Sequence, residues 1–364
     1  MLSSSLPHNS RIKKALTTRT RRRPRATAAV PRSFTPQPTD LRLGRIVRLL
    51  TDHATVVVSG TKIADEIGGS RSEVWRLIQQ LRGLGVDVAG HPATGYQLRA
   101  VPDLLLPNIL QPLVQGTRFG EHIHHFYKIG STNTAAMDAA AVGAPDGSVF
   151  LAEEQTAGRG RGANAWQSAR STGIYCSVVL RPALPPTEIL VLSLAVALAV
   201  RSAIRQIDSS VDPDLKWPND LLIGGKKVCG ILAEMNAEAT RVRYVVVGIG
   251  LNVNQATFPR ELADQATSLR LTTGSEWSRV ELAVALLKSL HGEYRDLLER
   301  PDARKLILRR FADYSSGIKG RAVRIEENGG SFEGTTEGLD DGGFLRVRAA
   351  GLLRTVLSGT VRPL

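Results

Sequence analysis

The sequence predicts an α+β protein with three folded units, and three observations carry this prediction. The chain has 364 residues, more than one hydrophobic core usually serves. Apolar residues repeat at helical spacing near the N-terminus, whereas the middle of the chain mixes long helical patterns with consecutive strand-like runs. Short β-like runs separated by glycine-rich turns fill the C-terminus. An apolar fraction of 42% can bury such cores and excludes wholesale disorder.

The first 40 residues carry most of the net charge of +13. They hold nine Lys or Arg against one acid and show no apolar periodicity, so we expect residues 1–40 to be a disordered basic tail. Three explanations for such a tail stay open: non-specific contact with nucleic acid, an arginine-rich organelle address, or a start codon assigned too early.

Residues 41–100 contain three helical patterns followed by a hairpin pattern. The first helix is marked by apolar residues such as Leu43, Ile46 and Leu50, and a second, short helix begins at Thr61. Ser70-Arg71-Ser72-Glu73 is a capping box that opens the third helix. Two strand-like pieces, 86–89 and 96–98, follow. This order is typical of a winged helix-turn-helix.

The third helix presents basic and polar residues at the end that enters a DNA major groove in this motif. The candidate DNA-binding residues are Arg71, Ser72, Trp75, Arg76 and Gln79. The alternative is an ordinary solvated face on a protein-interaction module. Separately, Trp75 could pack under the wing and not contact DNA. We favour DNA binding, because the basic residues cluster at the end of the third helix that would contact the bases.

Residues 101–117 are punctuated by prolines and are expected to be a linker, followed by a central mixed α/β domain over 118–316. The predicted strands are 124–129, 148–153, 174–180, 214–217, 227–234 and 243–249, and the predicted helices are 134–141, 189–207, 279–298 and 303–314. Consecutive strands that meet at Gly224–Gly225 indicate hairpins, so the sheet should be mixed or largely antiparallel. Residues 317–364 have the spacing of an SH3-like β barrel.

Two further features bear on location. The longest apolar run, 189–200, falls short of the roughly 20 residues of a membrane span, so we expect a buried helix and no membrane partner. Cys176 and Cys229 lie far apart without metal-binding spacing. That pattern favours a reducing, cytoplasmic location over a disulfide scaffold.

Common catalytic motifs are absent from the sequence. It contains no GxxxxGK[ST], HExxH, GxSxG or CxxC, and Gly158–Gly162 does not fit GxGxxG. His122 and His124 would share one face of a strand, but two imidazoles without a carboxylate make a weak metal site. We therefore predict no metal site.

Four polar segments remain as candidates for a binding site. Ser131-Thr132-Asn133 offers short donors and acceptors, although it could serve simply to begin a helix. Gln155 precedes Gly158–Gly162, a loop whose two arginines suit a carboxylate or phosphate and whose glycines let the backbone approach an anion.

The other two segments each end a predicted strand. Lys216-Trp217-Pro218-Asn219-Asp220 offers a lysine as a point charge for phosphate. The run from Gly248 to Asn254 ends an apolar strand with two glycines and two amides, which permits close approach by a ligand. No single segment is decisive, but their occurrence together in this order is specific.

Together these motifs resemble the biotin–protein ligases, and most closely the bifunctional bacterial type in which ligase and biotin operon repressor share one chain. Gly158-Arg159-Gly160-Arg161 and Lys216-Trp217-Pro218-Asn219-Asp220 carry the resemblance, which covers residues 41–364. Two departures stand out. Gly162-Ala163 stands where the family loop commonly continues Arg-Gly, and the basic tail has no counterpart in the bifunctional type.

The resemblance implies a reaction in two halves. The carboxylate of biotin attacks the α-phosphorus of ATP, with Mg²⁺ on the leaving pyrophosphate, and a lysine of the biotin carboxyl carrier protein of acetyl-CoA carboxylase then takes the biotinyl group. The implied catalytic residues are Lys216, Arg161 and Arg159. The implied biotin-binding residues are Ser131, Thr132, Asn133, Gln155, Arg159, Gly160, Arg161 and Lys216. The implied ATP- or adenylate-binding residues are Gly158, Trp166, Asn219, Gly248 and Asn252.

The resemblance also implies a biotin-responsive repressor that binds biotin operator DNA and forms a homodimer when the adenylate is bound. Three alternatives stay open. The chain could be a lipoate-type acyl ligase on the same fold, a repressor whose ligase-like domain senses an effector without turnover, or a ligase with a non-functional winged helix.

Overall fold

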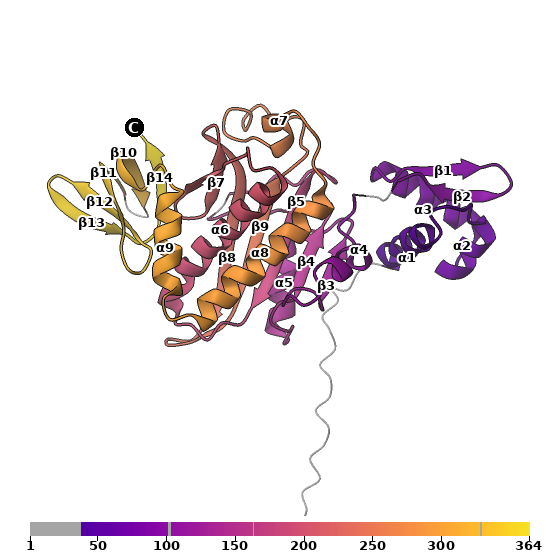
Figure 1. Ribbon diagram of the computed structural model, residues 1–364, viewed down its shortest axis with the longest axis horizontal. Coiled ribbons are helices and arrows are strands. Elements are labelled where there is room, and N and C mark those ends of the chain that lie inside the picture. The colour runs from indigo at the N-terminus through magenta and orange to yellow at the C-terminus, as the bar shows by residue number, and fades with distance from the viewer. Residues whose placement is uncertain (1–37, 101–102, 163, 328–329) are drawn as a thin grey trace, which may run out of the picture.

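The computed structural model describes residues 38–100, 103–162, 164–327 and 330–364. The basic tail expected over 1–40 lies outside these residues, apart from its last three, which begin the first helix. Figure 1 shows three bodies in a row: an N-terminal helical domain, a central sheet covered by helices, and a small C-terminal sheet at the opposite end.

The N-terminal domain packs three helices against a hairpin, as the sequence predicted. Its elements are α1 (Pro38–Asp52), α2 (Gly60–Ile67), α3 (Arg71–Gly83), β1 (Val88–His91) and β2 (Gly95–Leu98). The two strands are antiparallel. Ser59 and Ser70 begin α2 and α3 by accepting hydrogen bonds from backbone amides of the first turn. Apolar side chains such as Ile46 and Val74 meet in one core.

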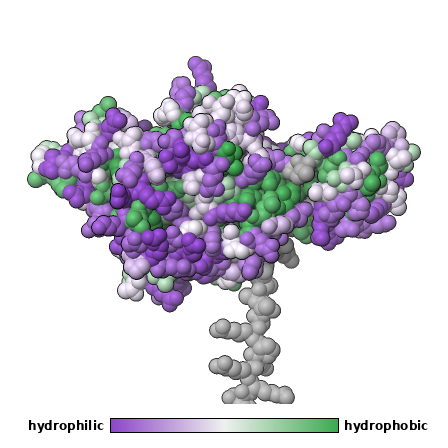
Figure 2. All heavy atoms as spheres, viewed as in Figure 1, coloured by the Kyte–Doolittle hydropathy of each residue, from purple (hydrophilic) through white to green (hydrophobic). Residues whose placement is uncertain are grey.

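Residues 103–117, here called the tether, are packed against both domains, whereas the sequence indicated a linker. Leu104 and Leu106 join the N-terminal core and Leu105 joins the central core, because neighbouring side chains of an extended segment face opposite sides. Helix α4 (Pro107–Leu113) forms the middle of the tether and contacts both the central sheet and a long central helix. Figure 2 shows an apolar area on this face where the central domain meets the tether.

The central domain is built on a seven-stranded mixed sheet, as predicted. Its strands are β3 (Ile123–Phe126), β4 (Val149–Ala152), β5 (Gly173–Leu180), β6 (Asp214–Lys216), β7 (Asp220–Ile223), β8 (Lys226–Ala237) and β9 (Val242–Asn252). They lie in the order β3-β4-β5-β9-β8-β7-β6. β3 is parallel to β4, and the other pairs in this sheet are antiparallel. Gly224 and Gly225 both adopt positive φ, which the two-residue turn between β7 and β8 requires.

Helices cover both faces of this sheet (Figure 1). Cys176 and Val178 on β5 share a core with α6 (Ile189–Ile207) and α8 (Arg279–Glu299), whereas Val179 packs with α5 (Thr132–Ala141) on the other face. The remaining helices are η2 (Pro186–Glu188), α7 (Leu269–Thr273) and α9 (Ala303–Asp313). By length and composition, Pro186–Ile207 could cross a membrane, but 78% of its apolar window is buried within the protein. It is the central core helix.

The C-terminal domain is a five-stranded antiparallel sheet in the order β13-β12-β11-β10-β14. Its strands are β10 (Lys319–Glu327), β11 (Gly330–Leu339), β12 (Leu345–Ala349), β13 (Leu352–Val356) and β14 (Thr360–Pro363). The last strand, β14, pairs with β10. Trp217 Nε1 donates to the Gly343 carbonyl at 2.9 Å, which ties the central sheet to this domain.

Candidate functional site

The polar segments singled out from the sequence meet at one cavity of about 520 Å³. Its wall includes the first turn of α5, the end of β6, and the loop before β14 in the C-terminal domain. It also includes part of the loop Gly158–Gly162, here called the glycine loop. The predicted site residues that line it are Ser131, Thr132, Asn133, Gln155, Arg159, Gly160, Arg161, Trp166, Lys216, Asn219 and Gly248.

The amide of Gln155 is held in one orientation beside the start of α5. Its Oε1 accepts hydrogen bonds from Thr132 N at 2.8 Å and Thr132 Oγ1 at 3.1 Å, and its Nε2 donates to Ser168 Oγ at 2.8 Å. Ser131 Oγ is buried and has no hydrogen-bond partner among the described residues. The cavity therefore offers an oriented amide beside a hydroxyl that a ligand can satisfy.

The side chain of Asn133 lies over Gly248 in the sheet. Ser177 on β5, Gly248 on β9 and Leu232 on β8 are in register, so these positions share one face of the sheet. A Cβ at Gly248 would lie 2.2 Å from Asn133 Oδ1, so the glycine leaves the space that the amide fills. Asn133 Nδ2 donates to Glu234 Oε2 at 2.8 Å.

The two arginines of the glycine loop have different partners. Arg159 is paired with Glu234. Arg161 Nη1 donates to Asn219 Oδ1 at 3.3 Å and to the Gly359 carbonyl at 3.4 Å, so the loop reaches the C-terminal domain. Burial lowers the pKa of Arg161, and the charge of Asp220 opposes that shift. The guanidinium remains a cation at neutral pH.

Lys216 is the last residue of β6, where that strand ends at the cavity. The next residue, Trp217, is buried and anchors the strand end through its bond to Gly343. Lys216 Nζ has no hydrogen bond or ion pair with any residue that the structure describes. The anchored strand therefore carries a cation that is available to a ligand.

The indole of Trp166 lies against two strand glycines. A Cβ at Gly250 would lie 2.4 Å from its ring, so this glycine is needed for the approach, and a Cβ at Gly230 would lie 3.0 Å from the ring, a tight contact. Lys227 Nζ lies 5.4 Å from the ring centroid and 2.7 Å from Asp220 Oδ1. Trp166 Nε1 is buried and has no partner within the described chain.

Two predicted site residues are not brought to the cavity. Asn252 is buried at the end of β9, where its Nδ2 donates to the Thr267 carbonyl at 3.0 Å and its Oδ1 accepts from Gln255 Nε2 at 3.2 Å. Gly158 allows a close backbone approach, since a Cβ there would lie 2.4 Å from the Trp166 carbonyl oxygen.

The predicted DNA-binding residues share the outer side of α3. Arg71, Ser72, Trp75 and Arg76 are exposed, and Gln79 is half-buried. Trp75 has 59% of its surface exposed, so it does not pack under the wing. The capping box forms in part: Ser70 caps the helix, while the Glu73 carboxylate bonds Arg42 at 2.6 Å and lies 3.6 Å from Arg76.

Sequence reasoning missed several residues of this site. Ser177 and Glu234 join the polar network, and Lys227 and the 358–361 loop line the cavity. Ser177 had a signal, because it is a polar residue inside the apolar run of β5. Glu234 had little signal, since its role depends on cross-strand register.

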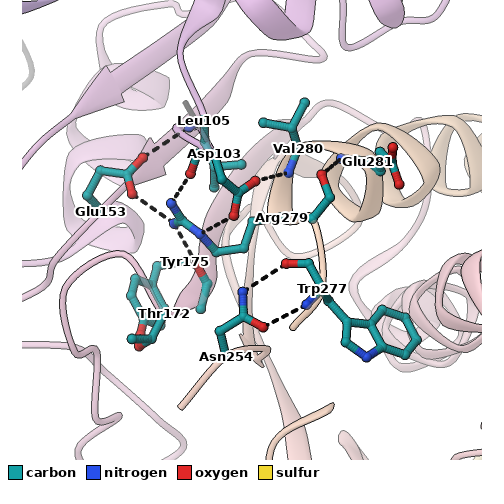
Figure 3. Close-up of polar contacts among 12 residues, drawn as sticks. Asp103, Leu105, Glu153, Thr172, Tyr175, Asn254, Trp277, Arg279, Val280 and Glu281 are labelled. Atoms are coloured by element: carbon teal, nitrogen blue, oxygen red, sulfur yellow. Dashed lines mark hydrogen bonds and ion pairs between the residues drawn. The ribbon is translucent and has the colours of Figure 1, made fainter. Parts of the chain in front are cut away.

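A buried ion cluster lies between the tether and the strand that leads to the cavity (Figure 3). Arg279, the first residue of α8, donates to Glu153 Oε2 at 2.8 Å and to Asp103 Oδ2 at 3.2 Å. Glu153 Oε1 also accepts from Leu105 N at 3.0 Å and lies 3.1 Å from His125 Nε2. Glu153 precedes Gln155 by two residues, so the cluster fixes the strand end beside the site.

Comparison with known proteins gives three family matches along the chain. They are a helix-turn-helix domain over residues 42–97, the biotin/lipoate A/B protein ligase family over 126–252, and a biotin protein ligase C-terminal domain over 319–362. A solved structure of biotin protein ligase from Aquifex aeolicus, in complex with biotin and ATP, has a TM-score of 0.58 at 28% identity. It covers 67% of this chain and 100% of its own.

Curated relatives extend the likeness over most of the chain. The bifunctional ligase/repressor BirA of Bacillus subtilis is 35% identical over 318 residues, which is 87% of this chain and 97% of the relative. The biotin–[acetyl-CoA-carboxylase] ligase of Mycobacterium tuberculosis is 36% identical over 64% of this chain and 85% of the relative.

The domain order, the cavity and these likenesses define a class: the chain belongs to the biotin protein ligase family. More particularly, it is the form that carries an N-terminal helix-turn-helix domain, homologous to the bifunctional ligase/repressors.

Proposed function

We propose that this protein biotinylates one lysine of the biotin carboxyl carrier protein of acetyl-CoA carboxylase, using ATP and passing through biotinyl-5′-AMP. Lys216 carries the proposal: it lines a cavity with both loop arginines and has no recorded partner within the described residues. The Aquifex relative is described with biotin and ATP bound, and the Mycobacterium relative is named for acetyl-CoA carboxylase. These descriptions support the same substrates here.

We assign the ureido end of biotin to the start of α5. The ureido ring is uncharged and both donates and accepts hydrogen bonds. Ser131 Oγ is available, and Gln155 and Thr132 are already oriented by one another. Asn133 lines the same wall, and its amide is already bonded to Ser177 Oγ and Glu234 Oε2, so we assign it to shaping this end of the cavity. The carboxylate end is then assigned to Arg159, Gly160, Arg161 and Lys216.

The first half-reaction needs cations rather than an enzyme nucleophile. An oxygen of the biotin carboxylate attacks the α-phosphorus, and the bond from that phosphorus to pyrophosphate breaks. Lys216 and Arg161 supply positive charge where negative charge develops. Burial raises the pKa of Cys176 to about 12, so this cavity residue stays a neutral thiol and no thiolate attack is expected.

Magnesium would enter with ATP. The carboxylates that line the cavity are Asp220, Glu326 and Glu327, and carboxylate oxygen is the ligand type that Mg²⁺ prefers. They form no metal-binding cluster among the described residues, and Asp220 and Glu326 are paired with Lys227 and Arg362, so the phosphates of ATP would carry the ion into the site. When bound, it would neutralise charge on the leaving pyrophosphate.

The adenosine end is assigned to the face of Trp166, whose indole can stack on a base. Asn219 lines the cavity and would support Arg161, since its Oδ1 accepts from Arg161 and its Nδ2 already donates to the Ile231 carbonyl at 2.7 Å. Gly158 and Gly248 shape this wall by permitting close contacts. Asn252 lies outside the cavity lining, and both polar groups of its amide already have partners, so its role would be to hold the Thr267 carbonyl and Gln255 in place.

The proposed reaction is tested by its first half. Purified protein is incubated with ATP and Mg²⁺, with and without biotin, and pyrophosphate and biotinyl-AMP are measured. We expect pyrophosphate release that requires biotin. Lipoate in place of biotin is the control for a lipoate-type ligase. Binding of biotin without any adenylate would instead indicate a sensor that performs no chemistry.

We further propose that the N-terminal domain makes the ligase a biotin-responsive repressor. A single winged helix with few outward cations binds DNA weakly, so a homodimer reading two half-sites is expected. The adenylate would favour that dimer by a coupling of about 1–3 kcal/mol. A cytoplasmic location suits free, buried Cys176 and Cys229. Operator-fragment binding, measured with and without adenylate against scrambled DNA, tests this role.

A further inference from the structure

A relay of polar contacts runs from the central sheet to the glycine loop. Ser177 Oγ lies 2.8 Å from Asn133 Oδ1, and Asn133 Nδ2 donates to Glu234 Oε2 at 2.8 Å. Arg159 Nη2 donates to Glu234 Oε1 at 2.6 Å. The two oxygens of one carboxylate therefore hold two different segments, the first turn of α5 and the loop that carries both arginines.

The inner part of the relay is buried and its outer part is exposed. Ser177 is 0% exposed and Asn133 is 4% exposed, with the Asn133 amide fitted over Gly248. The side chain of Arg159, by contrast, is 45% exposed. A long side chain at that exposure samples many rotamers unless a partner fixes it. The buried end of the relay thus restrains the exposed end.

Glu234 leaves part of the Arg159 guanidinium for a ligand. Arg159 lines the cavity and Glu234 does not, so Glu234 binds the arginine without being part of the cavity wall. Glu234 accepts a hydrogen bond from Arg159 Nη2, while Nε and Nη1 of Arg159 have no partner in the described parts of the chain. The buried amide of Asn133 holds the second oxygen of Glu234, so the carboxylate is fixed in place before any ligand binds.

We propose that Glu234 is a positioning residue that, anchored by Asn133, aims Arg159 at the anionic end of the bound ligand. This inference rests on the proposed function and deepens it by naming the group that preorganises one of its cations. The ligand anion is the biotin carboxylate before adenylation and the phosphate of the adenylate afterwards. Preorganisation lowers the entropic cost of binding that anion.

Glu234→Gln tests the relay, because a glutamine offers one acceptor and can satisfy Asn133 or Arg159 but not both. We expect the KM for biotin to rise about tenfold, as for loss of one charge-assisted hydrogen bond, with the KM for ATP unchanged. The matched control is Glu238→Gln. Its carboxylate pairs with exposed Arg243 at 2.7 Å and lies outside the cavity lining, so both KM values should stay at wild type.

A double-mutant cycle separates positioning from general loss of structure. In an Arg159→Met background, adding Glu234→Gln should change the biotin KM by less than about twofold, because the group being aimed is gone. Effects that multiply independently would overturn the inference. Thermal midpoints are recorded for every variant, and Glu234→Asp, with a shorter reach, replaces Glu234→Gln if that variant fails to fold.

The outcomes also separate this inference from the proposed function. A wild-type protein that forms biotinyl adenylate, with an unchanged biotin KM in Glu234→Gln, overturns the role of Glu234 alone. A wild-type protein that forms no adenylate overturns the proposed function and this inference together.

Discussion

Glu153 and Arg279 form an ion pair in which neither side chain is more than 1% exposed, with Nη1 and Oε2 2.8 Å apart. The pair joins residues 126 positions apart in the chain. Arg279 also binds Asp103, and Glu153 accepts the Leu105 amide, so the pair fixes the tether that leads to the N-terminal domain (Figure 3). Removing one member would leave the other buried charge without its principal partner.

This pair predicts a pH dependence of stability. Burial alone would raise the pKa of Glu153, but the charge of Arg279 and the contacts with His125 and Leu105 lower it from 4.5 to about 2. Such a carboxyl stabilises the fold above its unfolded pKa, and that contribution is lost as pH falls towards the folded pKa.

We therefore expect wild type to have a higher unfolding free energy than Glu153→Gln, with the largest difference near neutral pH. The excess should shrink as pH falls from about 5 towards 2. Urea denaturation at a series of pH values measures it. A difference that does not change with pH would show that Glu153 does not titrate in this range.

Replacing Lys216 should remove most adenylate formation. Lys216→Ala deletes a cation at the developing charge, so we expect a loss of roughly 10²-fold or more, about 2.7 kcal/mol of transition-state stabilisation. Pyrophosphate release at saturating biotin and ATP measures it. Lys288→Ala, on the exposed side of α8, is the control. Release by Lys216→Ala within about threefold of wild type would remove Lys216 from the reaction.

Replacing Arg161 should make the enzyme leak its intermediate. Arg161→Gly breaks the contacts to Asn219 and Gly359 that hold the glycine loop against the C-terminal domain. Free biotinyl-AMP should then label lysines of an added inert protein. The double variant Arg161→Gly with Lys216→Ala should lose this labelling. If labelling stays confined to the carrier protein, the loop does not retain the adenylate.

Filling the space at Gly250 should weaken ATP binding. A Cβ there would lie 2.4 Å from Trp166 Cε2, so the indole must shift from the sheet. We expect Gly250→Ala to raise the KM for ATP about tenfold. Gly292→Ala in α8 meets nothing within 4 Å and is the control. An ATP KM equal to that of wild type would exclude Trp166 as the adenine platform.

Substitutions on the outer face of α3 should affect operator binding and leave ligation unchanged. Arg71→Ala or Arg76→Ala is expected to abolish specific DNA binding while ligation stays at wild type. Binding is measured at physiological salt with scrambled DNA alongside, because nine cations in the tail could hold any DNA at low salt. The tail is removed at residue 37, since α1 begins at Pro38. Equal affinity for operator and scrambled DNA would show that the helix-turn-helix domain binds no specific operator and that the protein acts as a ligase alone.

The sequence predicted the features that depend on local pattern. Helical spacing placed α6 at 189–207, and the paired glycines after Ile223 placed the turn between β7 and β8. Several predicted site residues reached one cavity because their motifs end neighbouring strands or precede a helix. Features that depend on tertiary pairing were missed. Glu234 acts through cross-strand register, and the amide of Asn252 is taken by the Thr267 carbonyl and Gln255.

Transfer of biotin to the carrier is tested most directly by the mass of a biotin carboxyl carrier domain after incubation with this protein, biotin, ATP and Mg²⁺. We expect addition of one biotinyl group to one lysine, dependent on ATP and lost in Lys216→Ala. A carrier that gains no biotinyl group with the wild-type protein, under conditions in which an established biotin ligase modifies it, would show that this protein is not a biotin ligase for that carrier.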